Sequence, residues 1–309
     1  MANPVWIYGP ESHAALISEL ASALGLARGG AAIGRFADGE RRVEIRDDVM
    51  GCPAILLIST GPPVDSHVMT LALMADAVRR AGAGPVIGIV PYFGYARAER
   101  MAAPGSPIGC RVVADLVQGA GLSHLITFDL HNPAIAGFFT IPVLEQSALD
   151  PIARCFTGVS PERHVVVAPD AGAIKRVSHL ATLLGLPMAI AVKHRLGPDE
   201  PKVLQLWGEF KGREAIVFDD MVATGSTIEQ VANLLWQRGI AAIEVAAVHP
   251  VMAGEAERLL KSLGIRRFIT TDTIPFQPTA AWPGFEVVSI APVLIQTLKR
   301  GLGRLLAGE

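Results

Sequence analysis

Short apolar runs alternate with helical patterns along the whole chain, and this alternation limits the possible folds more than any other feature of the sequence. The apolar runs have the length and composition of buried strands, and the segments between them repeat their apolar residues with a helical period. This pattern predicts an α/β fold of mostly parallel sheets covered by helices on both faces. The predicted strands are residues 5–8, 54–59, 86–90, 125–128, 165–168, 188–192, 216–218 and 243–248, and the predicted helices include residues 12–24, 68–80, 108–118, 173–184 and 254–263.

The length of the chain favours two domains. It has 309 residues, 50% of them hydrophobic, which is enough to bury a large core. The boundary is predicted near residues 146–151, after the first run of strand and helix units. The two halves resemble one architecture used twice, and residues 292–306 form an amphipathic helix with Lys299, Arg300 and Arg304 on its polar side.

Charge and cysteine content restrict the partners of the chain. The formal net charge is −2, so we expect neither nucleic acid nor an acidic membrane surface as a partner. The chain contains no stretch of about eighteen apolar residues that could span a bilayer, and it does not begin with a secretion signal. Cys52, Cys110 and Cys155 are widely spaced without a metal-binding pattern, which favours reduced thiols. These features predict a cytoplasmic globular protein.

The stretch AIVFDDMVATGSTIEQ, residues 215–230, has the composition of a sugar-phosphate site. A predicted strand at residues 216–218 ends in two adjacent carboxylates, Asp219 and Asp220, and a small hydroxyl-rich turn at residues 223–227 leads into a helix. The turn can direct backbone N–H groups and hydroxyls at a phosphate, which the positive end of the helix dipole also attracts. The carboxylates would repel a phosphate but can accept hydrogen bonds from sugar hydroxyls. A ribose 5-phosphate fits this pattern, whereas a Walker A nucleotide loop would need a lysine that the turn lacks.

Further polar clusters occur between the predicted elements. Residues 35–40 (RFADGE) are expected between a helix and a strand, and residues 91–100 combine three aromatic side chains with two arginines that could stack on a base and clamp phosphates. His131 and Asp170 follow two strands and could serve a Mg²⁺ ion that also binds nucleotide phosphates. Residues 193–195 (KHR) precede a Gly/Pro-rich loop and could stabilise a transferring phosphoryl group. Taken singly, each cluster also fits a solvated turn, ordinary core packing or a structural histidine.

Taken together and in order, these segments resemble the ribose-phosphate diphosphokinases, also called PRPP synthetases. The matching motifs extend from about Phe36 to Pro275 and are RFADGE, PYFGYARAER, FDLHNPAIAGFF, APDAGAIKR, KHR, FDDMVATGST and TDTIPF. The resemblance implies two phosphoribosyltransferase-type α/β domains, each a mostly parallel sheet flanked by helices. It places an ATP-side domain at residues 1–147 and a ribose 5-phosphate domain at residues 148–291, with the C-terminal helix, residues 292–309, packing back on the first. It also implies dimers or hexamers and the Mg²⁺-dependent transfer of the diphosphoryl group of ATP to the 1-hydroxyl of ribose 5-phosphate, giving PRPP and AMP.

The same resemblance implies a role for individual residues. Lys193 and Arg195 would be catalytic, with Lys193 stabilising the transition state as its loop closes over the substrates. His131 and Asp170 would serve Mg²⁺–ATP. ATP would be bound by Phe36, Asp38, Gly39, Glu40, Arg97 and Ala98, with Phe36 against the adenine and Asp38, Gly39 and Glu40 contributed by a neighbouring subunit. Ribose 5-phosphate would be bound by Asp219, Asp220, Ala223, Thr224, Gly225, Ser226 and Thr227, with Arg195 nearby.

The chain departs from the family pattern at a few positions. Ala98 stands where a glutamine is usual, Glu99 follows it in place of an aspartate, and Ala223 replaces an aspartate that usually opens the phosphate loop. Two alternatives therefore remain at this point: a catalytically silent PRPP-synthetase-like regulatory subunit, supported by Ala98 and Ala223, and a phosphoribosyltransferase, supported by the ATGST turn. Unaided formation of AMP from ATP and ribose 5-phosphate separates the diphosphokinase from both.

Overall fold

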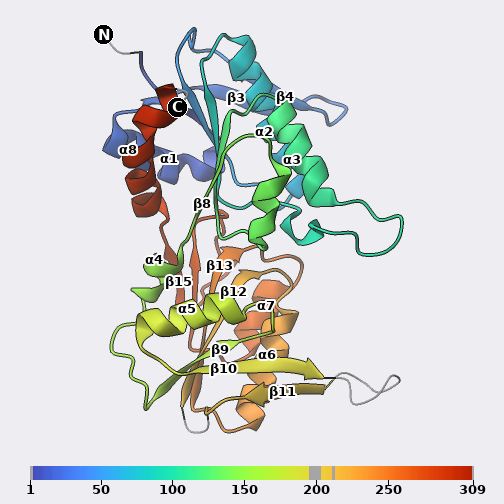
Figure 1. The fold of residues 1–309 in the computed structure, drawn as a ribbon, viewed down its shortest axis with the longest axis vertical. Coiled ribbons are helices and arrows are strands. Elements are labelled where there is room, and N and C mark those ends of the chain that lie inside the picture. The colour runs from blue at the N-terminus through green and yellow to red at the C-terminus, as the bar shows by residue number, and fades with distance from the viewer. Residues whose placement is uncertain (1–2, 195–202, 211–212, 308–309) are drawn as a thin grey trace. The chain divides into compact units, whose positions relative to one another are not determined.

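The computed structural model describes residues 3–194, 203–210 and 213–307, which form two α/β units (Figure 1). Unit 1 comprises Met1–Ser147, Thr273–Pro275 and Ser289–Glu309, and unit 2 comprises Ala148–Asp272 and Phe276–Val288. Both units contain parallel strands connected through helices, so the α/β class and the mostly parallel sheets predicted from the sequence are confirmed. No helix among the described residues is long and apolar enough to cross a membrane.

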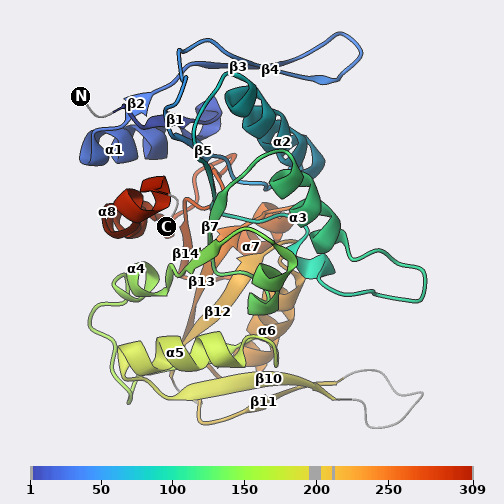
Figure 2. The same cartoon turned by 45° about the horizontal axis from the view of Figure 1, so that its top comes forward.

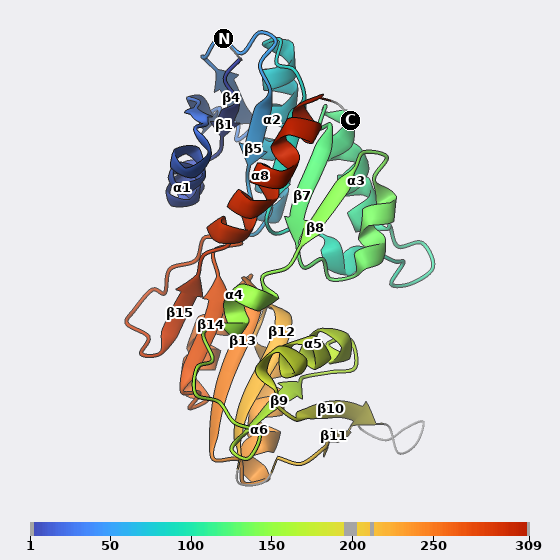
Figure 3. The same ribbon diagram turned by 60° about the vertical axis from the view of Figure 1, so that its left-hand side comes forward.

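Unit 1 is built on a six-stranded parallel sheet with the order β2-β1-β5-β6-β7-β8. Helices α1 and α8 lie on one face of this sheet and α2 and α3 on the other (Figure 3). The strands are β1 (Trp6–Tyr8), β2 (Ala27–Arg28), β5 (Ala54–Leu57), β6 (Val86–Val90), β7 (His124–Phe128) and β8 (Val143–Gln146); the helices are α1 (Ala14–Leu24), α2 (Val64–Arg80), α3 (Gly109–Gly119) and α8 (Ala291–Ala307), with short 3-10 turns at Glu11–His13, Ala96–Ala98 and Pro133–Phe138.

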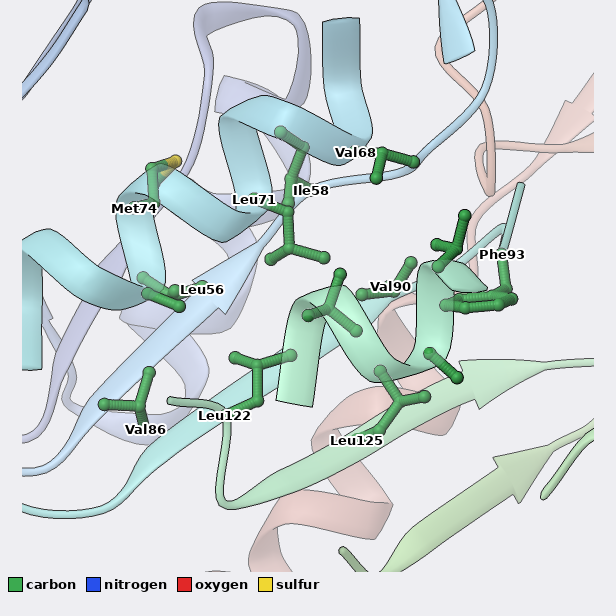
Figure 4. Packing of buried hydrophobic residues seen from close by; sticks show 14 of the residues in the cluster. Leu56, Ile58, Val68, Leu71, Met74, Val86, Val90, Phe93, Leu122 and Leu125 are labelled. Carbon is green, nitrogen blue, oxygen red and sulfur yellow. The ribbon is translucent and has the colours of Figure 1, made fainter. Parts of the chain in front are cut away.

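The core of unit 1 follows from the alternation of side chains along each strand. Leu56 and Ile58 of the β5 segment and Val86 and Val90 of β6 point toward α2 and α3, where they meet side chains such as Leu71 (Figure 4). The residues between them on each strand, such as Ile55 and Ile87, are equally buried. A strand that is buried on both faces reads as a continuous apolar run, which is why these strands were recognisable in the sequence.

Two segments from the far end of the chain belong to unit 1. Helix α8 packs beside α1, its Leu294 and Leu298 are fully buried, and Thr297 Oγ1 donates a 2.7 Å hydrogen bond to Gln146 Oε1. The short segment Thr273–Pro275 also joins this unit, because the Ser59 hydroxyl donates to the carbonyl oxygen of Thr273 at 2.5 Å. The last helix and a short segment of unit 1 thus come from chain that follows most of unit 2 in the sequence, whereas all six strands of its sheet come from the first part of the chain.

A hairpin in unit 1 corrects one sequence-based expectation. Residues 35–40 were expected between a helix and a strand, but they form the turn of an antiparallel hairpin made of β3 (Ala31–Arg35) and β4 (Arg41–Ile45). Strand β3 was missed because its sequence, AAIGR, consists mainly of small residues that give no alternating apolar signal. The hairpin packs its β4 strand against α2 (Figure 2).

Unit 2 is built on a seven-stranded sheet with the order β11-β10-β9-β12-β13-β14-β15. Its strand pairs are parallel except for β10–β11, which is antiparallel. Helix α4 packs with α5, and α6 packs with α7. The strands are β9 (His164–Ala168), β10 (Met188–His194), β11 (Val203–Trp207), β12 (Glu214–Val222), β13 (Ala242–Pro250), β14 (Arg267–Thr271) and β15 (Phe285–Val288); the helices are α4 (Leu149–Ala153), α5 (Ile174–Leu184), α6 (Ser226–Gln237) and α7 (Ala256–Ser262).

Candidate active site

The candidate sugar-phosphate residues of unit 2 lie at the carboxyl ends of two neighbouring strands. Strand β12 pairs in parallel with β9, with Val217 opposite Val167, so both chains run out of the sheet at the same edge. Asp170 lies two residues beyond the end of β9, and the turn at residues 223–227 follows the end of β12 directly. The fold therefore brings Asp170, the acidic pair and the turn to one edge of one sheet, which is where open α/β sheets bind ligands.

The acidic pair does not end its strand, contrary to the sequence-based expectation. Strand β12 runs from Glu214 to Val222 and contains both Asp219 and Asp220. It continues because its other neighbour, β13, extends equally far: Asp219 pairs with Ala247, and Val222 pairs with Pro250. Strand β10 likewise runs to His194 and not only to residue 192, since its last residues pair with β11.

Because side chains alternate along a strand, the two aspartates of the pair lie in different surroundings. Ala215 and Val217, which share the side of Asp219, pack in one apolar cluster with Ile228 and Val231 of α6. Asp220 belongs to the alternate set and forms an ion pair with Arg176 of α5, with 3.1 Å between Arg176 Nη2 and Asp220 Oδ1. The Asp220 side chain is only 3% exposed. Of these two neighbours in the sequence, Asp219 follows the residues of β12 that pack against α6, whereas Asp220 pairs with an arginine of α5.

Asp219 lies in a concentration of negative charge. Burial raises the pKa of Asp219 well above its ordinary value, and the nearby carboxylates of Asp220 and Asp170 raise it further. The backbone N–H of Asp220 partly offsets this by donating to Asp219 Oδ1 at 2.9 Å. Asp170 is itself exposed and accepts a hydrogen bond from the N–H of Ala173 at 3.1 Å. Ligands that donate hydrogen bonds or carry positive charge would relieve this repulsion.

The turn after β12 has the form of an anion site at a helix N-terminus. Gly225 adopts a φ of 80° as it leads into α6, a conformation that favours glycine. The N-cap residue Gly225 has no side chain, the Thr224 and Ser226 hydroxyls lie 3.1 Å apart beside it, and Thr224 Oγ1 accepts only a long, 3.5 Å hydrogen bond from the N–H of Ser226. Ala223 accepts a hydrogen bond from the N–H of Ala253, which fixes the start of the turn. First-turn N–H groups, hydroxyls and the helix dipole together favour a phosphate here.

The two predicted catalytic residues are only partly covered by the structure. The backbone of Lys193 lies in β10, opposite Leu204 of β11, and β10 pairs with β9. The side chain of Lys193 lies outside the described part of the chain, and so does Arg195 altogether. The structure thus gives the strand that carries Lys193 but not the position of either cationic group.

Unit 1 carries the residues predicted to bind ATP, in two separate places. Phe36, Asp38, Gly39 and Glu40 belong to the β3–β4 turn, which is closed by a 2.9 Å hydrogen bond from Phe36 N to Glu40 O. The Phe36 ring is 51% exposed, so one of its faces is accessible for stacking with a planar group.

The second place in unit 1 is at the carboxyl ends of β6 and β7. Arg97 and Ala98 lie in the 3-10 turn after β6, and the Arg97 side chain is exposed. His131 follows β7 and is half-buried. His131 and Asp170, the predicted metal residues, therefore belong to different units.

Sequence reasoning did not assign a role to Arg176, although it lies in the quoted segment APDAGAIKR. A signal was present: Arg176 is spaced three residues from Ala173, the buried N-cap residue of α5, and four from Leu180, which is buried within the helix. A charged residue on a buried helix face requires a partner of opposite charge. The sequence could have raised the question, but only the fold identifies Asp220 as that partner.

The chain is similar to proteins of one metabolic family over nearly its whole length. Residues 5–121 match the family described as the N-terminal domain of ribose phosphate pyrophosphokinase, and residues 148–278 match the phosphoribosyl transferase domain. A ribose-phosphate pyrophosphokinase of Aquifex aeolicus is 37% identical over 300 residues, which cover 96% of each chain. One of Staphylococcus aureus is 34% identical over 297 residues, covering 95% of this chain and 92% of the relative. The crystal structure of phosphoribosylpyrophosphate synthetase from Mycobacterium smegmatis superposes with a TM-score of 0.89 at 32% identity, covering 98% of this chain and 99% of that one.

The ion pair between Arg176 and Asp220 yields a stability prediction. Arg176→Leu removes the guanidinium group that pairs with the buried Asp220 carboxylate and should lower the free energy of unfolding by about 3–5 kcal/mol. Urea unfolding followed by circular dichroism measures this loss. Lys175→Leu, at the neighbouring exposed position, is the matched control and should be nearly neutral.

A double variant separates lost charge pairing from lost packing. In Arg176→Leu/Asp220→Asn the buried charge is gone, so most of the stability should return. If the double variant is as unstable as Arg176→Leu alone, the arginine acts through its packing and not through the ion pair.

Proposed function

Because this chain belongs to the ribose-phosphate pyrophosphokinase family, we propose that it transfers the β,γ-diphosphoryl group of ATP to the 1-hydroxyl of ribose 5-phosphate. The products are PRPP and AMP. The observation that carries this conclusion is the similarity over both units together with the acidic strand and phosphate turn of unit 2. In the reaction the 1-hydroxyl oxygen bonds to the β-phosphorus, the bond from that phosphorus to the oxygen of the α-phosphate breaks, and the hydroxyl proton is lost.

Unit 2 is proposed to bind ribose 5-phosphate. The 5-phosphate lies against Thr224, Gly225, Ser226 and Thr227 at the start of α6, with Ala223 leaving the entrance small. Asp219 accepts hydrogen bonds from the ribose hydroxyls, which relieves the repulsion that raises the pKa of this residue. Asp220 stands beside it and is fixed by Arg176, so in our proposal it mainly orients the strand and the Asp219 carboxylate.

Unit 1 is proposed to bind ATP. The exposed Phe36 ring stacks on the adenine, and the hairpin residues Asp38, Gly39 and Glu40 hydrogen-bond its edge, acting on the ATP of a neighbouring subunit in a dimer or hexamer. Arg97, exposed after β6, contacts the nucleotide. Ala98 lacks the side-chain hydrogen bonds that a glutamine would offer there, so this contact is made by the backbone alone.

The carboxylates of unit 2 fit a hard divalent cation, and we propose Mg²⁺. Asp170 and Asp220 together raise the pKa of Asp219, so the carboxylates lie close enough for a dication to lower their repulsion. No set of three His, Cys, Asp or Glu side chains among the described residues forms a complete metal site. That fits an ion that takes most of its ligands from substrate oxygens and water. Asp170 is our candidate ligand on unit 2 and His131 our candidate on unit 1; the ion, when bound, neutralises charge on the ATP phosphates.

Lys193 and Arg195 are proposed to stabilise the negative charge that develops on the transferring diphosphoryl group. Phosphoryl transfer relies mainly on positioning and on cations near the reacting phosphorus. Support comes from the strand pairing: the backbone of Lys193 lies in β10, β10 pairs with β9, and β9 leads to Asp170. We place this reaction in the cytoplasm, in keeping with three cysteines that are all free thiols.

The function is tested by incubating the purified chain with ATP, Mg²⁺ and ribose 5-phosphate and measuring AMP and PRPP. Equal amounts of the two products establish the diphosphokinase. Absence of AMP with every nucleotide tried would reject the proposal and favour the silent subunit, since Ala98 and Ala223 would then have removed the activity.

Lys193→Ala should lower kcat by about two to three orders of magnitude, since a cation near the transferring group acts mainly in the transition state. The same coupled assay measures kcat, and thermal unfolding verifies that the fold is intact. Lys175→Ala, an exposed lysine of α5 in the same unit, should keep the wild-type rate. A Lys193→Ala enzyme with normal turnover would exclude this lysine from the mechanism.

Asp219→Asn should have opposite effects on stability and on activity. Removing this charge relieves repulsion from Asp220 and Asp170, so the melting temperature in substrate-free and metal-free buffer should rise. Turnover should fall about a hundredfold, because the ribose hydroxyls lose a charged acceptor.

Asp220→Asn provides the contrasting variant to Asp219→Asn. It removes the negative charge that pairs with the Arg176 guanidinium, so the melting temperature should fall. If both variants lose stability, Asp219 has a structural role like that of Asp220.

A further inference from the structure

Two arginines of the β3–β4 hairpin meet at one serine hydroxyl in unit 1. Arg35 and Arg41 are directly opposite each other across the hairpin. Arg35 Nη2 donates to Ser66 Oγ at 2.6 Å, and Arg41 donates to the same oxygen from Nε at 3.1 Å and from Nη2 at 2.5 Å. A hydroxyl oxygen has two acceptor lone pairs, so three N–H groups exceed what Ser66 can satisfy. Like charges directly opposite on a strand pair are also destabilising.

Neither guanidinium group forms an ion pair within the part of the chain that the structure describes. Among the described residues, neither Arg35 nor Arg41 has a carboxylate within ion-pair distance. Burial and the charge of Arg35 lower the pKa of Arg41 accordingly. Arg42, the next residue on the alternate face of β4, behaves differently: its Nη2 lies 3.1 Å from Glu44 Oε2. Arg42, on the outer face of the hairpin, therefore has an ion-pair partner, whereas Arg35 and Arg41, which face α2, meet at a neutral hydroxyl.

These two arginines line a pocket of about 480 Å³ between the hairpin and the first turn of α2. Its wall includes apolar side chains, among them Val64 and Met69, and two carboxylates, Glu40 and Asp65. Asp65 is engaged elsewhere, since its Oδ1 accepts the Tyr95 hydroxyl at 2.5 Å, and the Glu40 side chain is exposed. The first turn of α2 has no side-chain cap, so its N–H groups add to the positive potential in which the guanidinium groups already lie.

We propose that Arg35 and Arg41 bind a phosphate group in this pocket, at a site separate from the phosphate turn of unit 2. Guanidinium groups match the geometry of phosphate oxygens, and one oxyanion would satisfy the donors that Ser66 cannot. The pocket is larger than inorganic phosphate, and its apolar wall could receive the organic part of a small phosphomonoester. Both sources share the same recognition chemistry.

Binding of inorganic phosphate to the full chain by isothermal titration calorimetry, at ionic strength matched with sodium chloride, tests the proposal. Arg41→Gln should abolish one phosphate site or weaken it at least tenfold. Arg42→Gln, the control with the same chemistry on the opposite face, should bind within twofold of wild type. The turn of unit 2 is unchanged in both variants, so the difference between them reports the hairpin site whether or not the proposed reaction is correct.

A second variant tests the need for negative charge without removing an arginine. Ser66→Asp places a carboxylate where the two guanidinium groups meet, so it should raise the melting temperature in phosphate-free buffer and eliminate the hairpin phosphate site. Ser66→Asn keeps the size of that side chain without the charge and should do neither. Unchanged phosphate binding in both Arg41→Gln and Ser66→Asp would overturn the proposal, even if one of the variants were destabilised.

Phenyl phosphate distinguishes the two sources of the phosphate group. Binding at least tenfold tighter than inorganic phosphate, and weakened by Met69→Ala, identifies an organic phosphate whose apolar part contacts Val64 and Met69. Equal binding of the two, lost together in Arg41→Gln, identifies free phosphate. Binding of neither at the hairpin refutes the site.

Discussion

In unit 2, β12 pairs in parallel with β9 on one side and with β13 on the other, and the residues proposed to bind the sugar phosphate take their positions from these two ladders. Pairing with β9 brings Asp170 to the same edge as the acidic pair. Pairing with β13 extends β12 past Asp219 and Asp220, so that the turn at residues 223–227 begins only after Val222. Since both ladders are buried between helices, water cannot compete for their hydrogen bonds, and the edge remains rigid without contributions from the ligand-binding side chains.

That rigid edge holds an arrangement of charges that is unfavourable in the absence of ligand. Burial and two neighbouring carboxylates raise the pKa of Asp219, while the adjacent Asp220 is stabilised by Arg176. The fold therefore pairs Asp220 with an arginine and leaves Asp219 beside two carboxylates, which a substrate or cation bound as proposed would compensate. Sites that bind ligands often carry such unrelieved charge, because the relief on binding contributes to affinity.

The same contrast occurs in the hairpin of unit 1. Arg42 has Glu44 within hydrogen-bond distance, whereas Arg35 and Arg41 converge on a neutral hydroxyl. The two faces of the hairpin thus differ in the same way as the two aspartates of β12. On one face the charge is paired within the protein, and on the other we propose that a ligand pairs it. In both places side chains alternate between the two faces of a strand, so a charged residue that is paired within the protein stands next to one that is not.

The sequence by itself determined the α/β class, most helices and buried strands, and the family to which the chain belongs, since apolar periodicity and motif order are properties of neighbouring residues. It did not determine the length of β12, the small-residue strand β3, the partner of Arg176, or the return of Thr273–Pro275 and α8 to unit 1. Each of these depends on contacts between residues far apart in the chain: β12 is as long as the strands beside it allow, and Arg176 needs a carboxylate 44 positions later. Only the tertiary structure decides such pairings, because the free energy of a long-range contact is gained once the intervening chain has folded.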